Sequence, residues 1–201
     1  VGGIVYFSRN IQGPDQLKEM LSKTQSYAEE IAGVPVFLGV DEEGGEVSRV
    51  AGNKNFSVTR YESMRAIGDS KDTSRAYDVG KNLASYLKEL GFNIDFAPDA
   101  DVITNSGNTV IGNRSFGEDP RLVGAMASQV VKGLQDNGVS ACLKHFPGHG
   151  GTVEDSHEGR AYTDKTLEEM EAAIEKRVPE KFKDMNMKAL KLGAAASAMI
   201  R

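Results

Sequence analysis

Cysteine is nearly absent from this 201-residue sequence, which contains Cys142 alone. A single thiol excludes an internal disulfide, and its place in an apolar stretch predicts a buried side chain. Long apolar runs are absent too, because no stretch approaches the roughly 18 residues of a membrane-spanning helix. Basic residues are not in excess, since the formal net charge is −5. Neither nucleic acid nor a membrane is therefore an expected partner.

What the sequence does contain is an ordinary globular composition, 39% hydrophobic and 26% charged. This length is enough for one hydrophobic core, and no shift of composition marks a linker. We therefore expect a single domain over residues 1–201. The sequence begins at Val1 rather than Met, and we expect both ends to have been cut or processed.

Segments rich in β-forming residues alternate along the chain with segments of helical periodicity. Buried strands are predicted at residues 1–7, 34–40, 92–98 and 139–143, with a fifth, Ala-rich strand at 193–200. Helices are predicted at about residues 14–32, 60–67, 73–90, 120–137, 164–177 and 180–192. Buried strands separated by helices predict an α/β fold with a parallel sheet and helices outside it.

The number of strands bears on the type of α/β fold. A complete (β/α)8 TIM barrel has eight strands and typically ~250 residues. We therefore predict an incomplete barrel of about five βα units, without its first residues and its C-terminal strands. Such a sheet leaves strand edges open, so self-association through those edges is a further expectation.

Polar clusters follow the predicted strands where each one ends. Asp41 begins an Asp-Glu-Glu-Gly-Gly run, and Asp99 and Asp101 follow the third strand. Arg114 lies in the next polar loop, and residues 144–157 follow the fourth strand. The carboxyl ends of parallel strands meet at one edge, where α/β folds place their functional groups. We expect these clusters to form one site.

The segment 144–157 holds all three histidines of the chain, His145, His149 and His157. A proline and several glycines exclude a helix, so the segment is predicted to be a loop that its glycines allow to move. Histidine titrates near neutral pH, and a neighbouring carboxylate such as Asp155 can fix its tautomer and stabilise its charged form. The loop is therefore a candidate for proton transfer.

Two other interpretations of this loop remain open. Asp155 and His157, with His145 and His149, have metal-binding side chains, although the residues between the last two prevent the helix that would align them. The glycines at 148–151 could cradle a phosphate, but they match neither a P-loop nor a dinucleotide-binding fingerprint. We expect no metal and no cofactor.

Structural roles also compete with functional ones elsewhere. His149 is expected to hydrogen-bond the loop rather than take part in catalysis. Arg49 is either a ligand contact or the salt-bridge partner of an acid at 41–42. Asp99 and Asp101 are expected to shape their loop.

The order of four motifs resembles one enzyme family. Lys-His-Phe-Pro-Gly-His-Gly at 144–150, followed by Asp-Ser-His at 155–157, resembles the signature of the glycoside hydrolase family 3 β-N-acetylglucosaminidases of the NagZ type. The segments at 40–49, 93–102 and 112–120 resemble three further motifs of that family. The resemblance covers most of the chain and becomes vaguer near its end.

The resemblance implies a (β/α)8 barrel that hydrolyses terminal β-linked N-acetylglucosamine by a retaining mechanism. It implies that His157 is the general acid/base and that Asp155 is its partner. The residues that it implies to contact the sugar are Asp41, Arg49, Arg114, Lys144 and His145. Related β-glucosidases lack the Asp-Ser-His loop, so the resemblance favours N-acetylglucosamine over glucose.

The resemblance also implies a nucleophilic aspartate on a later strand. The acids at 158–201 belong to helix starts or exposed faces, and the sequence ends at Arg201, so we expect that nucleophile to be missing from this chain. The alternatives to an enzyme are an inactive fragment or engineered partial barrel, and a non-catalytic sugar-binding module. The resemblance further suggests peptidoglycan turnover in a bacterial cytoplasm, although secreted relatives exist.

Overall fold

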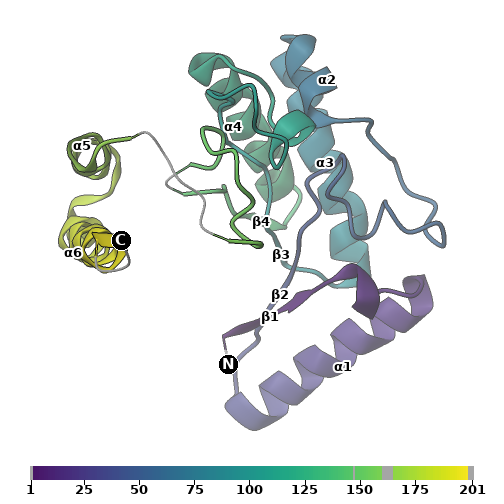
Figure 1. The fold of residues 1–201 in the computed structure, drawn as a ribbon. Helices are drawn as coiled ribbons and strands as arrows, with labels where there is room; N and C mark the ends of the chain where they lie inside the picture. Colours follow the sequence, from purple (N-terminus) through teal and green to yellow (C-terminus); the bar gives the residue numbers. More distant parts are fainter. Residues whose placement is uncertain (1, 147, 160–164, 199–201) are drawn as a thin grey trace.

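Four short parallel strands form a sheet in the computed structural model, which describes residues 2–146, 148–159 and 165–198. The strands are β1 (Gly3–Tyr6), β2 (Phe37–Val40), β3 (Ile94–Asp95) and β4 (Ser140–Ala141). They lie side by side in the order β1-β2-β3-β4 (Figure 1). The first four predicted strand positions are confirmed, but each strand is shorter than predicted.

Neighbouring strands pair through fixed partners. Gly3 pairs with Phe37, Val40 with Asp95, and Asp95 in turn with Ala141. Because all four strands run in the same direction, their carboxyl ends lie along one edge of the sheet. The loops that follow β2, β3 and β4 therefore meet at that edge.

Helices make the crossovers between consecutive strands. The crossover helices are α1 (Pro14–Ala32), α2 (Met64–Asp69), α3 (Thr73–Leu90) and α4 (Pro120–Asp136). Figure 1 shows α1, α3 and α4 on one side of the sheet. A sequential strand order with helices on one side is the arrangement of a (β/α) barrel, whereas a doubly wound sheet carries helices on both faces. The chain therefore forms part of a barrel.

The ends of these helices follow from local residue chemistry. A proline stands at the first position of α1 and of α4, where its missing N–H leaves no hydrogen bond unmade. The Asp119 side chain caps α4 by accepting from the backbone N–H of Arg121. Helices α1 and α3 end at Gly33 and Gly91, whose φ angles of +70° and +107° favour glycine.

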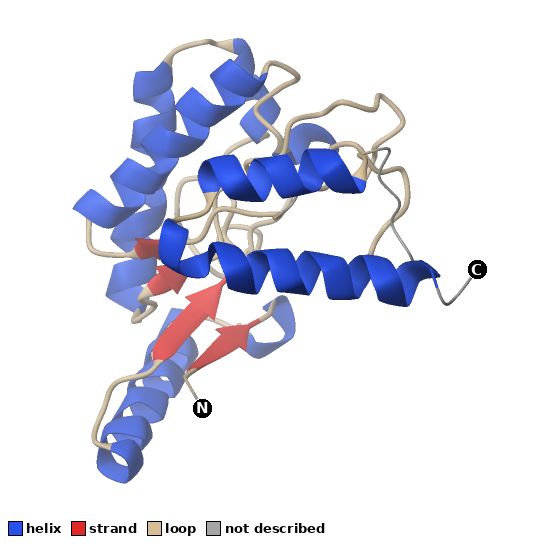
Figure 2. Ribbon diagram, turned by 90° about the vertical axis from the view of Figure 1, so that its left-hand side faces the viewer, coloured by secondary structure: helices blue, strands red, loops and turns tan. Residues whose placement is uncertain are grey.

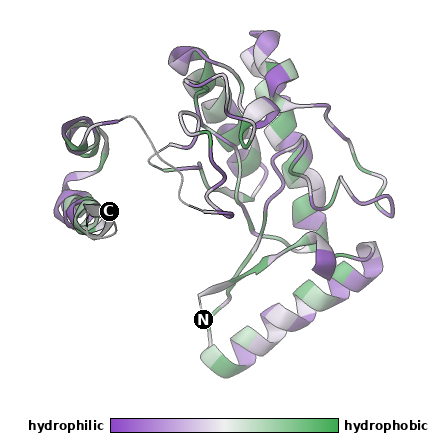
Figure 3. Ribbon diagram, viewed as in Figure 1, coloured by the Kyte–Doolittle hydropathy of each residue, from purple (hydrophilic) through white to green (hydrophobic). Residues whose placement is uncertain are grey.

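The hydrophobic core lies between the sheet and its helices. Its largest fully buried apolar side chains are Phe116, Leu17, Leu21, Leu38, Met64, Leu83, Leu87, Ile111, Met126 and Leu134. Figure 3 shows that α1, α3 and α4 each carry hydrophobic and hydrophilic residues, as expected for helices that bury one face.

Helices α3 and α4 approach each other closely at two glycines. A Cβ atom at Gly80 would lie 2.2 Å from the carbonyl oxygen of Val130, and one at Gly133 would lie 2.3 Å from that of Tyr77. Both distances are far below van der Waals contact. The crossing of α3 over α4 therefore depends on glycine at these two positions.

Replacing Gly80 with alanine is expected to lower the free energy of unfolding by ~1–3 kcal/mol, because the two helices must separate. Urea unfolding measures the change. Gly124→Ala in α4 is the matched control, since nothing lies within 4 Å of a Cβ built there. Alanine's higher helix propensity should make that variant up to about 1 kcal/mol more stable. Equal stabilities of the two variants would contradict the close crossing.

Two further helices, α5 (Leu167–Arg177) and α6 (Glu180–Ala198), follow the sheet in sequence. The prediction of a fifth strand at 193–200 is wrong over 193–198, where α6 continues, and its last two residues lie outside the described part of the chain. Alanine has the highest helix propensity, and the Ala-rich run lacks the β-branched residues that favour strands. The described part of the chain thus contains four strands rather than five.

Helix α5 begins at a capping box in which Thr166 and Glu169 satisfy each other's backbone N–H groups. The start predicted for this helix, at about residue 164, lies outside the described residues. Helices α5 and α6 pack against each other and stand apart from the sheet in Figure 1, and Figure 2 shows them side by side. The single domain over residues 1–201 stays a prediction.

Several apolar side chains of the strands and their ends remain exposed, namely Ile4, Val5, Phe7, Phe37 and Leu143. The prediction of fully buried strands is wrong at these positions, because the described helices α1, α3 and α4 cover only one side of the sheet. Cys142 is half-buried rather than buried. Among the described residues, no helix is both long and apolar enough to cross a membrane.

Candidate active site

Charged side chains from three loops and a short 3-10 helix, η2 (Gly112–Arg114), gather at the carboxyl-end edge of the sheet. Pairing between β3 and β4 continues into the loops, since the backbone N–H of Ala100 donates to the carbonyl of Lys144 at 2.7 Å. We call the gathered residues the polar cluster, which consists of Asp41, Glu43, Asp99, Asp101, Arg114, Lys144 and His145.

Glu43 lies at the centre of the polar cluster and is only 1% exposed. Its Oε1 is 2.7 Å from Lys144 Nζ and 2.8 Å from a terminal nitrogen of Arg114, and its Oε2 is 2.8 Å from Arg114 Nε. Lys144 Nζ also donates to Asp41 Oδ1 at 2.7 Å. One carboxylate therefore holds both cations, and Asp41 holds one of them from the other side.

Both cations of the polar cluster stay charged. Burial by itself lowers the pKa of Lys144, but Glu43 and Asp41 outweigh this effect and raise the pKa above its ordinary value. The same balance applies to Arg114, whose pKa is raised by Glu43 and Asp99 against the effect of burial. The two side chains therefore act as permanent hydrogen-bond donors.

Asp101 holds His145 in place from the neighbouring loop. Its Oδ2 is 2.6 Å from His145 Nδ1 and 3.3 Å from the backbone nitrogen of the same residue. Its Oδ1 accepts from the backbone N–H of His149 at 2.5 Å. Since Nδ1 donates to Asp101, Nε2 of His145 faces Arg114, 3.4 Å away.

His149 connects this arrangement to the rest of its loop. Its Nδ1 is 2.7 Å from Thr152 Oγ1 and its Nε2 is 3.2 Å from Ser156 Oγ. Its carbonyl accepts from Asn108 Nδ2 at 2.6 Å. These contacts agree with the interpretation of His149 as a residue that hydrogen-bonds the loop.

The base of the loop is tightly fixed at Gly150. A Cβ atom there would lie 2.0 Å from the carbonyl oxygen of Val102. The Gly150 carbonyl accepts from the backbone N–H of Thr104 at 3.1 Å. Glycine is thus needed at this position for close packing, and the loop movement that the sequence predicts stays a prediction.

Asp155 and His157 form a hydrogen-bonded pair beyond this base. His157 Nδ1 is 2.7 Å from Asp155 Oδ1, and its backbone N–H donates to the same oxygen at 2.9 Å. The His157 side chain is 87% exposed. Hydrogen bonds from the backbone and side chain of His157 lower the pKa of Asp155, which therefore stays ionised. No contact within the described residues joins His157 to Lys144 or to His145.

A surface cavity of about 620 Å³ lies beside this pair, between residues 109–110 and 153–159. Asp155 forms part of its wall, and the residues of the polar cluster do not. The cavity therefore adjoins the Asp155–His157 pair and is separate from the cluster.

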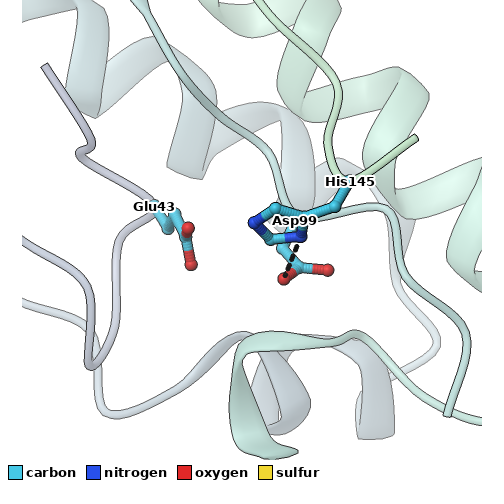
Figure 4. A group of neighbouring side chains, drawn as sticks. All are labelled: Glu43, Asp99 and His145. Atoms are coloured by element: carbon cyan, nitrogen blue, oxygen red, sulfur yellow. Dashed lines mark ion pairs between the residues drawn. The ribbon is translucent and has the colours of Figure 1, made fainter. Parts of the chain in front are cut away.

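Asp99 lies close to its neighbours in the polar cluster without a complete set of hydrogen bonds. Figure 4 shows Asp99, His145 and Glu43 converging, with His145 Nδ1 3.8 Å from Asp99 Oδ2. Burial, followed by the negative charge of Asp101, raises the pKa of Asp99 to about 7. Burial acts on Asp101 as well, but its hydrogen bonds from His145 and from a backbone N–H outweigh it, and its pKa is lowered.

Replacing Asp99 with asparagine is expected to weaken the pH dependence of stability. The pKa of Asp99 rises from 3.8 to about 7 on folding, so between these values the folded state holds a proton that the unfolded state releases. The resulting stability is full below about pH 4 and is lost as pH rises through about pH 7. Urea unfolding at several pH values should show a shallower fall in the variant. Asp119→Asn, at an exposed helix cap, is the control, and a wild-type slope in Asp99→Asn would contradict the expectation.

Comparisons of the chain with known proteins point to one family. The family model described as the glycosyl hydrolase family 3 N-terminal domain matches residues 1–183. The chain belongs to glycosyl hydrolase family 3. It is 38% identical over 160 residues to beta-hexosaminidase A of Pseudoalteromonas piscicida, covering 79% of this chain and 27% of that protein. It is 36% identical over 181 residues to the beta-hexosaminidase of Neisseria meningitidis serogroup C, covering 86% of this chain and 47% of that protein.

Solved structures of family 3 members resemble the fold. The NagZ structure from Neisseria gonorrhoeae superposes with a TM-score of 0.73 at 35% identity, covering 86% of this chain and 50% of that chain. A family 3 beta-N-acetylglucosaminidase from Paenibacillus sp. superposes with a TM-score of 0.73 at 43% identity, covering 78% of this chain and 29% of that chain. The chain thus spans half or less of the length of these relatives.

Of the five sugar contacts that the resemblance implies in this family 3 chain, four belong to the polar cluster, and Arg49 does not. Among the described residues, no ion pair joins Arg49 to Asp41 or Glu42. Arg49 Nε is buried without a hydrogen-bond partner. The salt-bridge interpretation of Arg49 therefore has no support, and its contact with sugar stays a prediction.

The polar cluster also contains side chains that could ligate a metal. One ligand atom from each of Glu43, Asp99 and His145 lies within 4.8 Å of the others. Arg114 already occupies this space, with a terminal nitrogen 2.8 Å from Glu43, 3.7 Å from Asp99 and 3.4 Å from His145. The cation that these groups hold is therefore a guanidinium, and a metal ion would have to displace it.

Glu43 is the residue of this family 3 site that the sequence did not single out. It stands in a run of three acids, of which only Asp41 was predicted to contact a ligand. Its neighbour Glu42 turns the other way, and accepts from the backbone of Val50 and Ala51 and from Tyr86. No signal in the run itself distinguishes the two glutamates.

Proposed function

We propose that the chain supplies the sugar-binding and proton-transfer groups of a retaining β-N-acetylglucosaminidase. The observation that carries the proposal is the polar cluster at the carboxyl ends of the strands, with the Asp155–His157 pair on the loop that follows β4. Barrel enzymes bind and transform their substrates at this edge. The names of the relatives as beta-hexosaminidases favour N-acetylated sugar over glucose.

The polar cluster has unused capacity for a neutral sugar. Lys144 has three N–H donors, of which Asp41 and Glu43 accept two. Asp41 is 21% exposed and uses Oδ1 for Lys144, so its Oδ2 can accept from a hydroxyl group. In the proposed complex these groups bind adjacent hydroxyls, and Arg114 and His145 complete the wall of the site.

In the proposed reaction, His157 exchanges protons with the leaving group and with water. Its Nδ1 donates to Asp155, which fixes the tautomer and leaves Nε2 to carry the proton. A retaining glycosidase first protonates the leaving oxygen and then takes a proton from water. A histidine has a pKa suited to both steps near neutral pH, and ionised Asp155 stabilises the charged ring.

The exposed position of His157 implies movement in this proposal. Residues 153–157 close over a bound sugar, while His149 and Gly150 keep the base of the loop fixed. Closure also excludes water from the site.

The reaction further requires an attacking carboxylate. Glu43 and Asp101 are committed to cations and N–H groups, and Asp41 is committed to Lys144. Asp99 is almost fully buried. We assign the nucleophile to none of these residues.

The test is hydrolysis of a nitrophenyl β-N-acetylglucosaminide by the intact gene product, compared with the corresponding β-glucoside. Faster release of nitrophenol from the N-acetylated substrate is expected. Binding of N-acetylglucosamine without turnover would instead favour a sugar-binding module. Binding should be lost in Lys144→Met and kept in Lys132→Met, which changes an exposed lysine of α4.

A further inference from the structure

Glu43 has an unusual position among the acids of the polar cluster, because it contacts both permanent cations at once. Its two oxygens make contacts of 2.7–2.8 Å with Lys144 and Arg114. The Arg114 contact is bidentate, which fixes the plane and direction of the guanidinium group. Glu43 itself is almost fully buried, so water cannot take its place at low cost.

Arg114 has two further contacts. Its Nη1 donates to the carbonyl of Val110 at 3.0 Å, and its Nη2 faces His145 Nε2 at 3.4 Å. Within the described residues, four of its five N–H donors therefore have partners. Lys144 has acceptors there for two of its three N–H donors, which leaves one for a ligand.

The charge of the polar cluster also depends on Glu43. Two cations, Lys144 and Arg114, face four carboxyl groups from Asp41, Glu43, Asp99 and Asp101. An anionic ligand would meet cations that are already neutralised, next to further acidic groups. Like charges this close in a partly buried site repel each other strongly.

We propose that Glu43 is a positioning and specificity-determining residue, which orients Lys144 and Arg114 and selects uncharged sugars over sugars that carry phosphate or sulfate. This inference rests on the proposed function for the identity of the sugar. The exclusion of anions by the charge of Glu43 does not depend on which sugar binds. Without the charge of Glu43, Arg114 loses its bidentate partner, and its Nε and Nη2 become available to an oxyanion, which a guanidinium fork binds well.

The test measures the dissociation constants of N-acetylglucosamine and inorganic phosphate by calorimetry at fixed pH and ionic strength. Glu43→Gln is compared with Glu46→Gln, which changes an exposed acid of the same loop. We expect Glu43→Gln to weaken sugar binding roughly tenfold or more. The ratio of phosphate affinity to sugar affinity should rise by more than about tenfold, since a full charge is removed beside both cations. Glu46→Gln should change neither constant.

Glu43→Asp separates orientation from charge. The shorter side chain should weaken sugar binding but still exclude phosphate, because the charge remains. If Glu43→Gln does not fold, the proposal is tested with Glu43→Asp and the wild type. Wild-type protein that binds phosphate as tightly as the sugar overturns the proposal. An unchanged affinity ratio in folded Glu43→Gln also overturns it. If the wild type binds no N-acetylglucosamine, the proposed function fails, while a gain of phosphate binding in Glu43→Gln still supports the charge role.

Discussion

Replacing His157 with alanine is expected to lower kcat/KM for β-N-acetylglucosaminide hydrolysis by ~10²–10⁴-fold, the usual contribution of a general acid/base. Loss of His157 removes the proton for the leaving group and the base for water. The deficit should be smaller for a nitrophenyl substrate, whose leaving group needs little protonation, than for an alkyl or sugar glycoside. The measurement is steady-state hydrolysis of both substrates by the intact gene product.

Two controls separate catalysis from structure in this experiment. Azide can attack a glycosyl intermediate without a base, so it should restore turnover of the nitrophenyl substrate in His157→Ala. Glu158→Gln changes an exposed neighbour of His157 and should leave the rates unchanged. An equal loss for both substrates, with no effect of azide, would indicate that His157 supports the loop rather than transferring protons.

Replacing Asp101 with asparagine is expected to affect both halves of the site. The carboxylate accepts from the ring and backbone of His145 through one oxygen, and from the backbone of His149 through the other. An amide offers only one acceptor, and its NH2 group opposes one of these donors. Hydrogen bonds to a charged partner contribute about 1.5–3 kcal/mol each, so sugar affinity should fall by roughly tenfold to a hundredfold.

The readout for Asp101→Asn combines calorimetry with nitrogen NMR of the histidine rings. The wild type should show His145 with a proton on Nδ1, and the variant should show a mixture of tautomers. Asp119→Asn provides a control, because asparagine caps a helix as well as aspartate does. If affinity fell in the variant while the ring spectrum stayed unchanged, Asp101 would not be orienting His145.

The sequence predicted the helices of the sheet region well, since local chemistry sets their ends. Helix α3 was predicted at 73–90 and occupies the same residues, with Gly91 as its stop. Strand positions were predicted too, because apolar runs between helices are distinctive. Strand lengths and the exposure of Phe37 or Leu143 were not, since they depend on which faces of the sheet are covered.

The candidate site was predicted only in outline, and the run Asp41-Glu42-Glu43 shows the reason. Three adjacent acids have three different environments. Asp41 is partly exposed and forms an ion pair with Lys144. Glu42 is buried and accepts from backbone N–H groups, whereas Glu43 is buried and contacts two cations. Their directions depend on a loop conformation that residue type does not encode. Arg114 and Lys144 were predicted because they follow strands, and because the family resemblance implies that they contact the sugar.

The sequential order of the strands has a consequence for how the protein forms during synthesis. Each strand docks beside the one made just before it, and α4 packs on α3, so no unit waits for a distant partner. A chain that emerges from the ribosome can therefore add one βα unit at a time. The cluster around Glu43 is completed only when Lys144 and His145 emerge. Once Arg114 has emerged, Glu43 has a cationic partner before Lys144 is made.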